Sequence, residues 1–80
     1  MSLELGKVLV VDDEAAIRRL LRNTLQVNDY RVFEAGTVAE ALAMAVTHAP
    51  DVILLDLGLP DGDGLTVIDA VRQRSAVPII

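Results

Sequence analysis

The sequence predicts an α/β fold, a doubly wound parallel sheet with helices on both faces, and three observations lead to this prediction. Short apolar segments alternate along the chain with longer segments of helical periodicity. The apolar segments are continuous, which is typical of strands buried on both faces, as in a parallel sheet. The connections between them are long enough for the crossovers that parallel pairing requires. A chain of 80 residues has room for one small domain of this kind.

Four segments are expected to be strands because each is short and rich in branched apolar residues. They are Lys7–Val11, Arg31–Ala35, Asp51–Asp56 and Val77–Ile80. The second is expected to lie at an edge of the sheet. No helix follows the fourth to cover its outer side, so the sheet is expected to be truncated in this strand.

Three segments carry apolar residues at helical spacing and are expected to be amphipathic helices. The first contains Ile17, Leu20, Leu21 and Leu25 and ends near Asn28; the second follows a capping box at Thr37–Glu40 and stops before Pro50; the third contains Leu65, Ile68 and Val71. The arginines of the first helix are interpreted as its solvated face. His48, near the end of the second, is interpreted as a surface residue at a helix terminus.

Composition and charge exclude several classes of function. Twelve acidic residues stand against seven basic ones, for a formal charge of −5, which argues against a nucleic-acid-binding surface. The chain has no cysteine, and therefore neither a disulfide nor a thiolate metal site. Its apolar runs are too short to span a membrane, and its opening residues are too few and too acidic for a signal peptide. We therefore expect a soluble, cytoplasmic domain that binds neither nucleic acid nor membrane.

Three aspartates follow predicted strands, at the ends where α/β sheets bind their ligands. Asp12 and Asp13 follow the first strand, and Asp56 ends the third. If these strands are neighbours, the carboxylates converge, and only a cation or a proton makes that arrangement tolerable. Ligands that are all oxygen favour Mg²⁺ or Mn²⁺. A carboxylate beside such a cation can attack phosphorus, because the cation neutralises charge on the phosphoryl oxygens.

Each acidic residue also has a purely structural interpretation. An aspartate at a strand end is often a turn former or a helix N-cap, and Asp13 directly precedes a helix. Asp61 and Asp63 lie in a loop rich in glycine and are interpreted as loop and helix-start residues. Two adjacent acids together with a third on a neighbouring strand favour a site over these structural roles.

Two stretches, Val10–Glu14 and Asp51–Gly64, resemble the receiver domain of two-component response regulators. The acidic pair, the strand-terminal aspartate and the Leu-Pro-x-Gly-x-Gly turn have the spacing of that family. The resemblance implies a flavodoxin-like, or CheY-like, fold with strand order 2-1-3-4-5 and a switch between the first and third strands. The stretches Ile17–Arg22, Asp56–Gly64 and Arg72–Pro78 are most similar to the branch of the family that regulates potassium transport.

The resemblance also implies a role for each site residue. Asp56 would accept a phosphoryl group from a histidine of a sensor kinase and would also be a ligand of the metal ion. Asp13 would bind Mg²⁺ directly, and Asp12 would hold it directly or through water. The backbone carbonyl of Gly58 would supply a further oxygen. The protein would then be a signalling domain with an aspartyl phosphoacceptor, and not a turnover enzyme.

The resemblance extends over nearly the whole chain but over only the amino-terminal part of the family's domain. Residues 1–80 are therefore expected to be a single partial receiver domain. The Ser or Thr and the Lys that bind phosphoryl oxygens in the family have no counterpart here, and any DNA-binding effector domain would lie outside this segment. If the chain ends at Ile80, its open strand edge favours association, for which a homodimer is one arrangement.

Two other functions remain open at this point. A haloacid-dehalogenase-like phosphohydrolase also uses a strand-end aspartate and Mg²⁺, but it expects a second aspartate at the position of Gly58. A receiver-like interaction module would keep the fold and perform no phosphotransfer.

Overall fold

A computed structural model describes residues 6–56 and 58–80 of the chain. Residues 1–5 lie outside this range, and with them most of the segment that was judged unsuitable as a signal peptide. The strands are β1 (Gly6–Val11), β2 (Tyr30–Ala35) and β3 (Val52–Leu55); the helices are α1 (Ala15–Val27), α2 (Val38–His48) and α3 (Gly64–Arg72). The predicted alternation of strands and helices is therefore confirmed.

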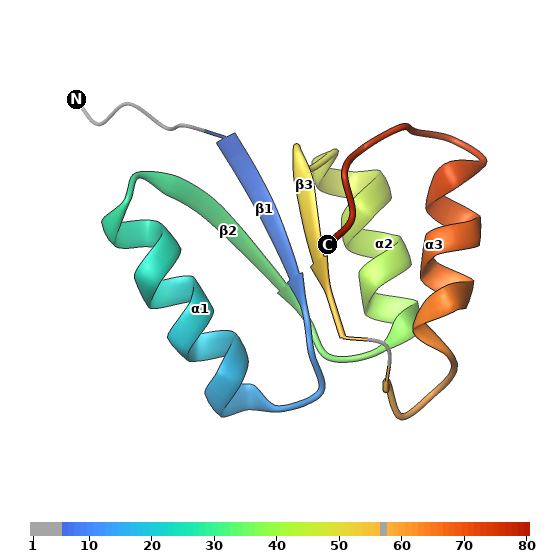
Figure 1. Ribbon diagram of the computed structural model, residues 1–80, viewed down its shortest axis with the longest axis horizontal. Helices are drawn as coiled ribbons and strands as arrows, with labels where there is room; N and C mark the ends of the chain where they lie inside the picture. The colour runs from blue at the N-terminus through green and yellow to red at the C-terminus, as the bar shows by residue number, and fades with distance from the viewer. Residues whose placement is uncertain (1–5, 57) are drawn as a thin grey trace.

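The three strands form one parallel sheet in the order β2-β1-β3, with β1 in the centre and β2 at an edge as predicted. Val8 pairs with Val32 on one side and with Val52 on the other. Helix α1 covers one face of the sheet, while α2 and α3 cover the other (Figure 1). A doubly wound sheet arises in this way when the crossover direction reverses, which happens here between β1 and β3.

The predicted fourth strand is present only as a short pairing with β3. Ile79 forms a parallel bridge with Ile53, and the Leu55 N–H donates to the Ile80 carbonyl at 2.9 Å. Val77 lies before this pairing and contacts the core from the loop that leaves α3. The side chain of Arg72 donates to the Val77 carbonyl and so holds that loop against the end of α3.

The core lies between the sheet and the pair α2 and α3. Leu9 and Ile53 from the sheet, Ala41 from α2 and Val67 from α3 are all fully buried. On the opposite face, Val8 and Val10 of β1 are buried, although no residue of α1 itself is buried. Leu20, which the helical spacing places on the apolar side of α1, is 65% exposed.

The caps of the helices explain where the chain turns. Thr37 accepts the Glu40 N–H at 3.1 Å, as the predicted capping box requires, while the Glu40 carboxylate accepts the Gly36 N–H. Helix α2 ends at His48, and its C-cap residue Ala49 has a left-handed φ of 45°. Among the described residues, no helix has the length and apolar character needed to cross a membrane.

Candidate metal centre

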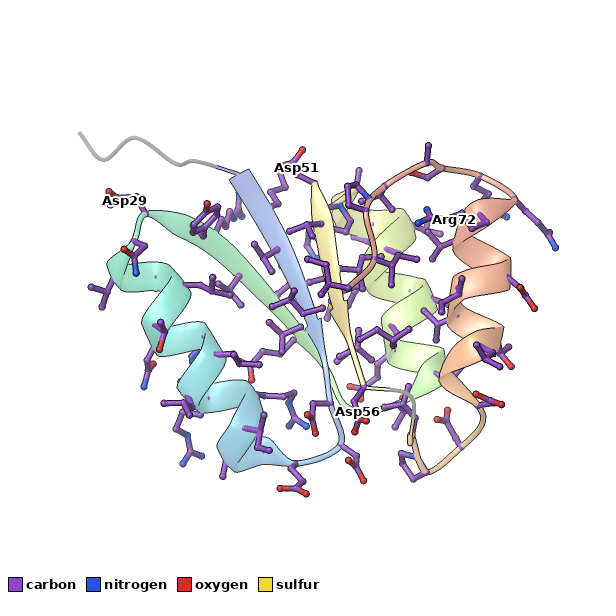
Figure 2. The ribbon with its side chains drawn as sticks, viewed as in Figure 1. Asp29, Asp51, Asp56 and Arg72 are labelled. Carbon is purple, nitrogen blue, oxygen red and sulfur yellow. The ribbon has the colours of Figure 1, made fainter. Side chains whose placement is uncertain are left out.

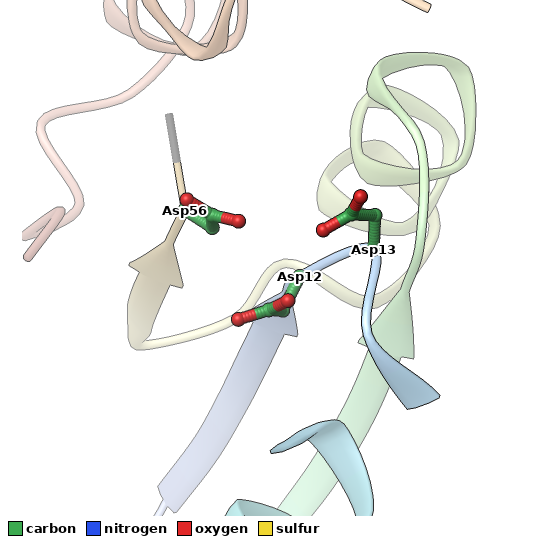
Figure 3. A group of neighbouring side chains, drawn as sticks. All are labelled: Asp12, Asp13 and Asp56. Carbon is green, nitrogen blue, oxygen red and sulfur yellow. The ribbon is translucent and has the colours of Figure 1, made fainter. Parts of the chain in front are cut away.

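The two strands that carry the predicted site residues are neighbours, and this brings the three aspartates together. The backbone N–H of Asp56, directly after β3, donates to the Val11 carbonyl at 2.8 Å. Asp12 and Asp13 follow β1 at the same edge of the sheet, and each of the three residues offers a carboxylate oxygen within 4.8 Å of the others. Figure 3 shows the three side chains facing one another. Asp12 and Asp56 are half-buried, and Asp13 is exposed.

Local hydrogen bonds orient two of these carboxylates and leave oxygens free. Asp12 Oδ1 accepts the Glu14 N–H at 2.9 Å, and Asp56 Oδ1 accepts the Gly58 N–H at 3.2 Å. Within residues 6–56 and 58–80, no hydrogen bond reaches the second oxygen of either residue or the carboxylate of Asp13. Asp13 is not the cap of α1, because the N-cap residue is Glu14 and no side chain caps it.

Among the described residues, no basic side chain forms an ion pair with the three carboxylates. The ion pairs in this part of the chain all involve Glu34. Carboxylates so close together repel one another unless a cation or a proton lies between them. A donor set made only of oxygens, open to water at Asp13, favours Mg²⁺ or Mn²⁺ over Zn²⁺.

A cavity of about 400 Å³ lies beside the cluster. Asp12 and Asp56 line it at the carboxyl edge of the sheet, and its wall continues over apolar side chains that include Ile17, Leu54 and Ile80. The site thus borders an apolar region on the α1 face of the sheet.

Gly58 is linked to the site by a hydrogen bond in which its backbone N–H donates to the carboxylate of Asp56. A role for its carbonyl oxygen stays a prediction. Leu57, the first residue of the predicted loop, lies outside the described residues.

The loop aspartates have structural roles, as predicted, and do not belong to the cluster. Asp63 is the N-cap of α3 and accepts the Leu65 N–H at 2.9 Å. Asp61 accepts the N–H groups of Val38 and Ala39, at 2.7 and 3.1 Å, and so caps α2 from another loop. These bonds, with that from Val38 the strongest influence, hold the pKa of the Asp61 carboxyl below its usual value. The sequence contains no signal that Asp61 caps α2, because Asp61 lies far along the chain from the start of that helix.

Two interpretations of other residues are corrected by the structure. Arg19 is exposed, as predicted, but Arg18 and Arg22 do not belong to a solvated face, because both pair with Glu34 of β2, at 3.4 and 2.9 Å. His48 is the last residue of α2, as expected, but it is half-buried and its ring stacks on Phe33 with centroids 3.8 Å apart.

A parallel sheet in the order β2-β1-β3 with an acidic cluster at its carboxyl edge defines a flavodoxin-like α/β protein with a site suited to a divalent cation. Comparison with known families makes the class specific. Residues 8–80 match the response regulator receiver domain. The chain belongs to this family, whose members are the signalling domains of two-component systems.

Two similar proteins are transcriptional regulators. The chain is 58% identical over 73 residues to the KDP operon transcriptional regulatory protein KdpE of Escherichia coli K12, covering 91% of this chain and 32% of that protein. It is 49% identical over 74 residues to the transcriptional regulatory protein ResD of Bacillus subtilis, covering 92% of this chain and 31% of that protein. The chain thus spans about a third of the length of these relatives. The predicted similarity to the potassium-transport branch is confirmed.

Solved structures agree in fold. The chemotaxis response regulator CheY4 of Vibrio cholerae superposes with a TM-score of 0.88 at 40% identity, covering 92% of this chain and 64% of that one. The response regulator TrrA of Thermotoga maritima, in complex with Mg²⁺ and BeF, gives a TM-score of 0.82 at 35% identity, covering 89% and 62%.

Proposed function

We propose that this chain is a phosphoacceptor in two-component signalling, in which Asp56 accepts a phosphoryl group from a histidine of a sensor kinase. Asp12, Asp13, Asp56 itself and the backbone carbonyl of Gly58 hold the Mg²⁺, or Mn²⁺, that the transfer needs. The observation that carries the proposal is the convergence of three carboxylates within 4.8 Å at the ends of β1 and β3.

The hydrogen bonds of Asp56 suit it to the role of nucleophile. The Gly58 N–H fixes one carboxylate oxygen, and the second oxygen is free to attack phosphorus. A P–O bond to Asp56 forms as the P–N bond to the kinase histidine breaks, and the bonding pair stays on the imidazole nitrogen. A bound divalent cation supplies positive charge that offsets the repulsion between the phosphoryl oxygens and this acidic cluster.

The proposed phosphotransfer also implies which molecules this chain contacts. We propose that the kinase is the direct partner of this segment and that a parent protein regulates transcription through parts that the relatives have and residues 1–80 do not include. Residues 1–80 would then be part of a single receiver domain in the cytoplasm. Pairing of two copies through the strand edge at residues 78–80 remains a proposal of the same kind.

Mass spectrometry after incubation with Mg²⁺ and acetyl phosphate tests the assignment. The protein is expected to gain one phosphoryl group that persists for minutes and maps to Asp56. Asp56→Asn should abolish the gain, whereas Asp61→Asn and Asp63→Asn, whose carboxylates cap helices, should retain it. A phosphopeptide that maps to Asp61 or Asp63 would overturn the choice of acceptor.

The same experiment separates the two other functions. Continuous release of phosphate over many turnovers would indicate a phosphohydrolase. Failure of the wild-type protein to form any adduct, with the fold intact, would indicate an interaction module without phosphotransfer.

A further inference from the structure

The peptide bond between Asp12 and Asp13 is held by a side chain from α1. Arg18 Nη1 donates to the Asp12 carbonyl oxygen at 2.7 Å. This carbonyl belongs to the peptide group that joins the two carboxylate-bearing residues of the site. In the described part of the chain, no other side chain donates to the backbone between Asp12 and Glu14. The Asp12 N–H donates to the Ala35 carbonyl at 3.0 Å, so Arg18 and β2 together hold the backbone from which the two carboxylates project.

The guanidinium is itself fixed on the sheet. Its Nε lies 3.4 Å from Glu34 Oε1, and the other oxygen of Glu34 accepts from Arg22 at 2.9 Å. Glu34 belongs to β2, where it pairs with Val10 of β1. The side chains of Arg18 and Glu34 are only 21% and 27% exposed, so that water competes little for these contacts.

Gly36 leaves the space that the guanidinium occupies. A Cβ at this position would lie 3.0 Å from Arg18 Nη1, closer than side chains normally allow. Arg18 thus sits between the loop after β1, Glu34 on β2, and the glycine that follows β2. One planar group with several fixed donors can bind the loop and the strand at once, and a lysine ammonium cannot reproduce this arrangement.

We propose that Arg18 is a positioning residue of the acidic site, one that holds the Asp12–Asp13 peptide so that both carboxylates face Asp56 before a cation binds. The inference rests on the proposed function for the identity of the ligand. The charge of Arg18 and its positioning of the peptide have opposite effects on cation binding, because a positive charge near the site repels a cation. Charge alone therefore predicts tighter Mg²⁺ binding when Arg18 is neutralised, and positioning predicts weaker binding.

The test compares Arg18→Lys and Arg18→Gln with Arg22→Lys and Arg22→Gln. Arg22 is the matched control, because it shares Glu34 with Arg18 but does not touch the Asp12 carbonyl. Mg²⁺ affinity is measured by titration calorimetry, and thermal unfolding verifies the fold of each variant. Both Arg18 variants are expected to bind Mg²⁺ about tenfold more weakly, as for other groups that orient metal ligands. Both Arg22 variants should stay within about twofold of the wild type.

A second readout needs no metal. The Glu14 N–H donates to Asp12 Oδ1, so its hydrogen exchange in the metal-free protein reports the order of this loop. Exchange should become faster in the Arg18 variants and not in the Arg22 variants. If an Arg18 variant fails to fold, Gly36→Ala displaces the guanidinium without removing it and should have the same two effects.

The Mg²⁺ affinities of the variants and the exchange of the Glu14 N–H together test the role of Arg18. Unchanged or tighter Mg²⁺ binding in the Arg18 variants would overturn the proposal, as would equal losses in the Arg18 and Arg22 variants. A wild-type protein that binds no Mg²⁺ would instead refute the proposed function, and Glu14 exchange would still show whether Arg18 orders the loop.

Discussion

Asp61 closes the amino-terminal end of α2, although it lies in the loop that leads to α3: its Oδ1 accepts the Val38 N–H at 2.7 Å. Its other oxygen accepts the Ala39 N–H, so one carboxylate satisfies two of the free donors of the helix. The loop that begins after Asp56 is in this way tied to α2, on the face of the sheet that α2 and α3 cover. Figure 2 shows Asp56 at the opposite end of β3 from Asp51.

The Asp61 cap predicts an acid-dependent loss of stability. Because its pKa is lower in the folded state than the value of 3.8 for the free group, its contribution is present above that value and is lost as the pH falls through the folded pKa. Asp61→Asn should lower the melting temperature at neutral pH and reduce its decline in acid. Asp69→Asn, on the exposed side of α3, is the control and should change neither. Parallel melting curves for wild type and Asp61→Asn would contradict the role of the charge.

The sequence alone was sufficient for the three strands of the sheet and for the acidic cluster, and the reason is physical. A continuous apolar run such as the one that ends in Val11 fits a central parallel strand, and an acid that follows it must lie at the carboxyl edge of the sheet. The partners of Arg18 were not predictable, because helical periodicity gives the polar side of α1 but not what faces it. Helical periodicity also fails to predict which residues of α3 are buried. The spacing of Leu65 suggests that it belongs to the core, yet Leu65 is 54% exposed and Val67 is buried instead.

The burial of Leu9 predicts a large loss of stability on truncation. Leu9 is fully buried in the centre of β1 among the residues of the core. Leu9→Ala should lower the free energy of unfolding by about 2–5 kcal/mol, because it removes apolar burial and leaves a cavity. Leu20→Ala, the same change at a residue that is 65% exposed, should cost well under half as much. Denaturant unfolding of both variants measures the difference, and equal losses would mean that α1 is covered more fully than the structure indicates.

The left-handed backbone of Ala49 predicts that glycine at this position stabilises the end of α2. Its φ of 45° is left-handed, a conformation that costs a residue with a Cβ about 1–2 kcal/mol. Ala49→Gly relieves that strain but increases the entropy of the unfolded chain, so the net gain should be about 0.5 kcal/mol. The same substitution at Ala43, exposed in the middle of α2, should instead lower stability by about 1 kcal/mol. Opposite signs in thermal unfolding are the expected result, and a loss in both would show that Ala49 is unstrained.

Replacing Asp13 by Asn is expected to have opposite effects on the stability of the protein and on its affinity for Mg²⁺. Without a cation, Asp13→Asn removes one of three neighbouring negative charges and should stabilise the protein by up to about 1 kcal/mol. Its affinity for Mg²⁺ should fall at least tenfold, about 1.4 kcal/mol, because the carboxylate that we propose as a direct ligand loses its charge. Asp56→Asn should weaken Mg²⁺ binding to a similar extent.

Unfolding measured with and without Mg²⁺ checks the Asp13 and Asp56 predictions together. Saturating Mg²⁺ should raise the wild-type melting temperature and raise that of Asp13→Asn much less, since a ligand stabilises only in proportion to its affinity for the folded state. Asp63→Asn is a suitable control, because its carboxylate caps α3 and lies outside the cluster. It should lose stability but keep the full response to Mg²⁺. An Asp13→Asn variant with wild-type affinity would remove this residue from the ligands of the cation, leaving the site to Asp12 and Asp56.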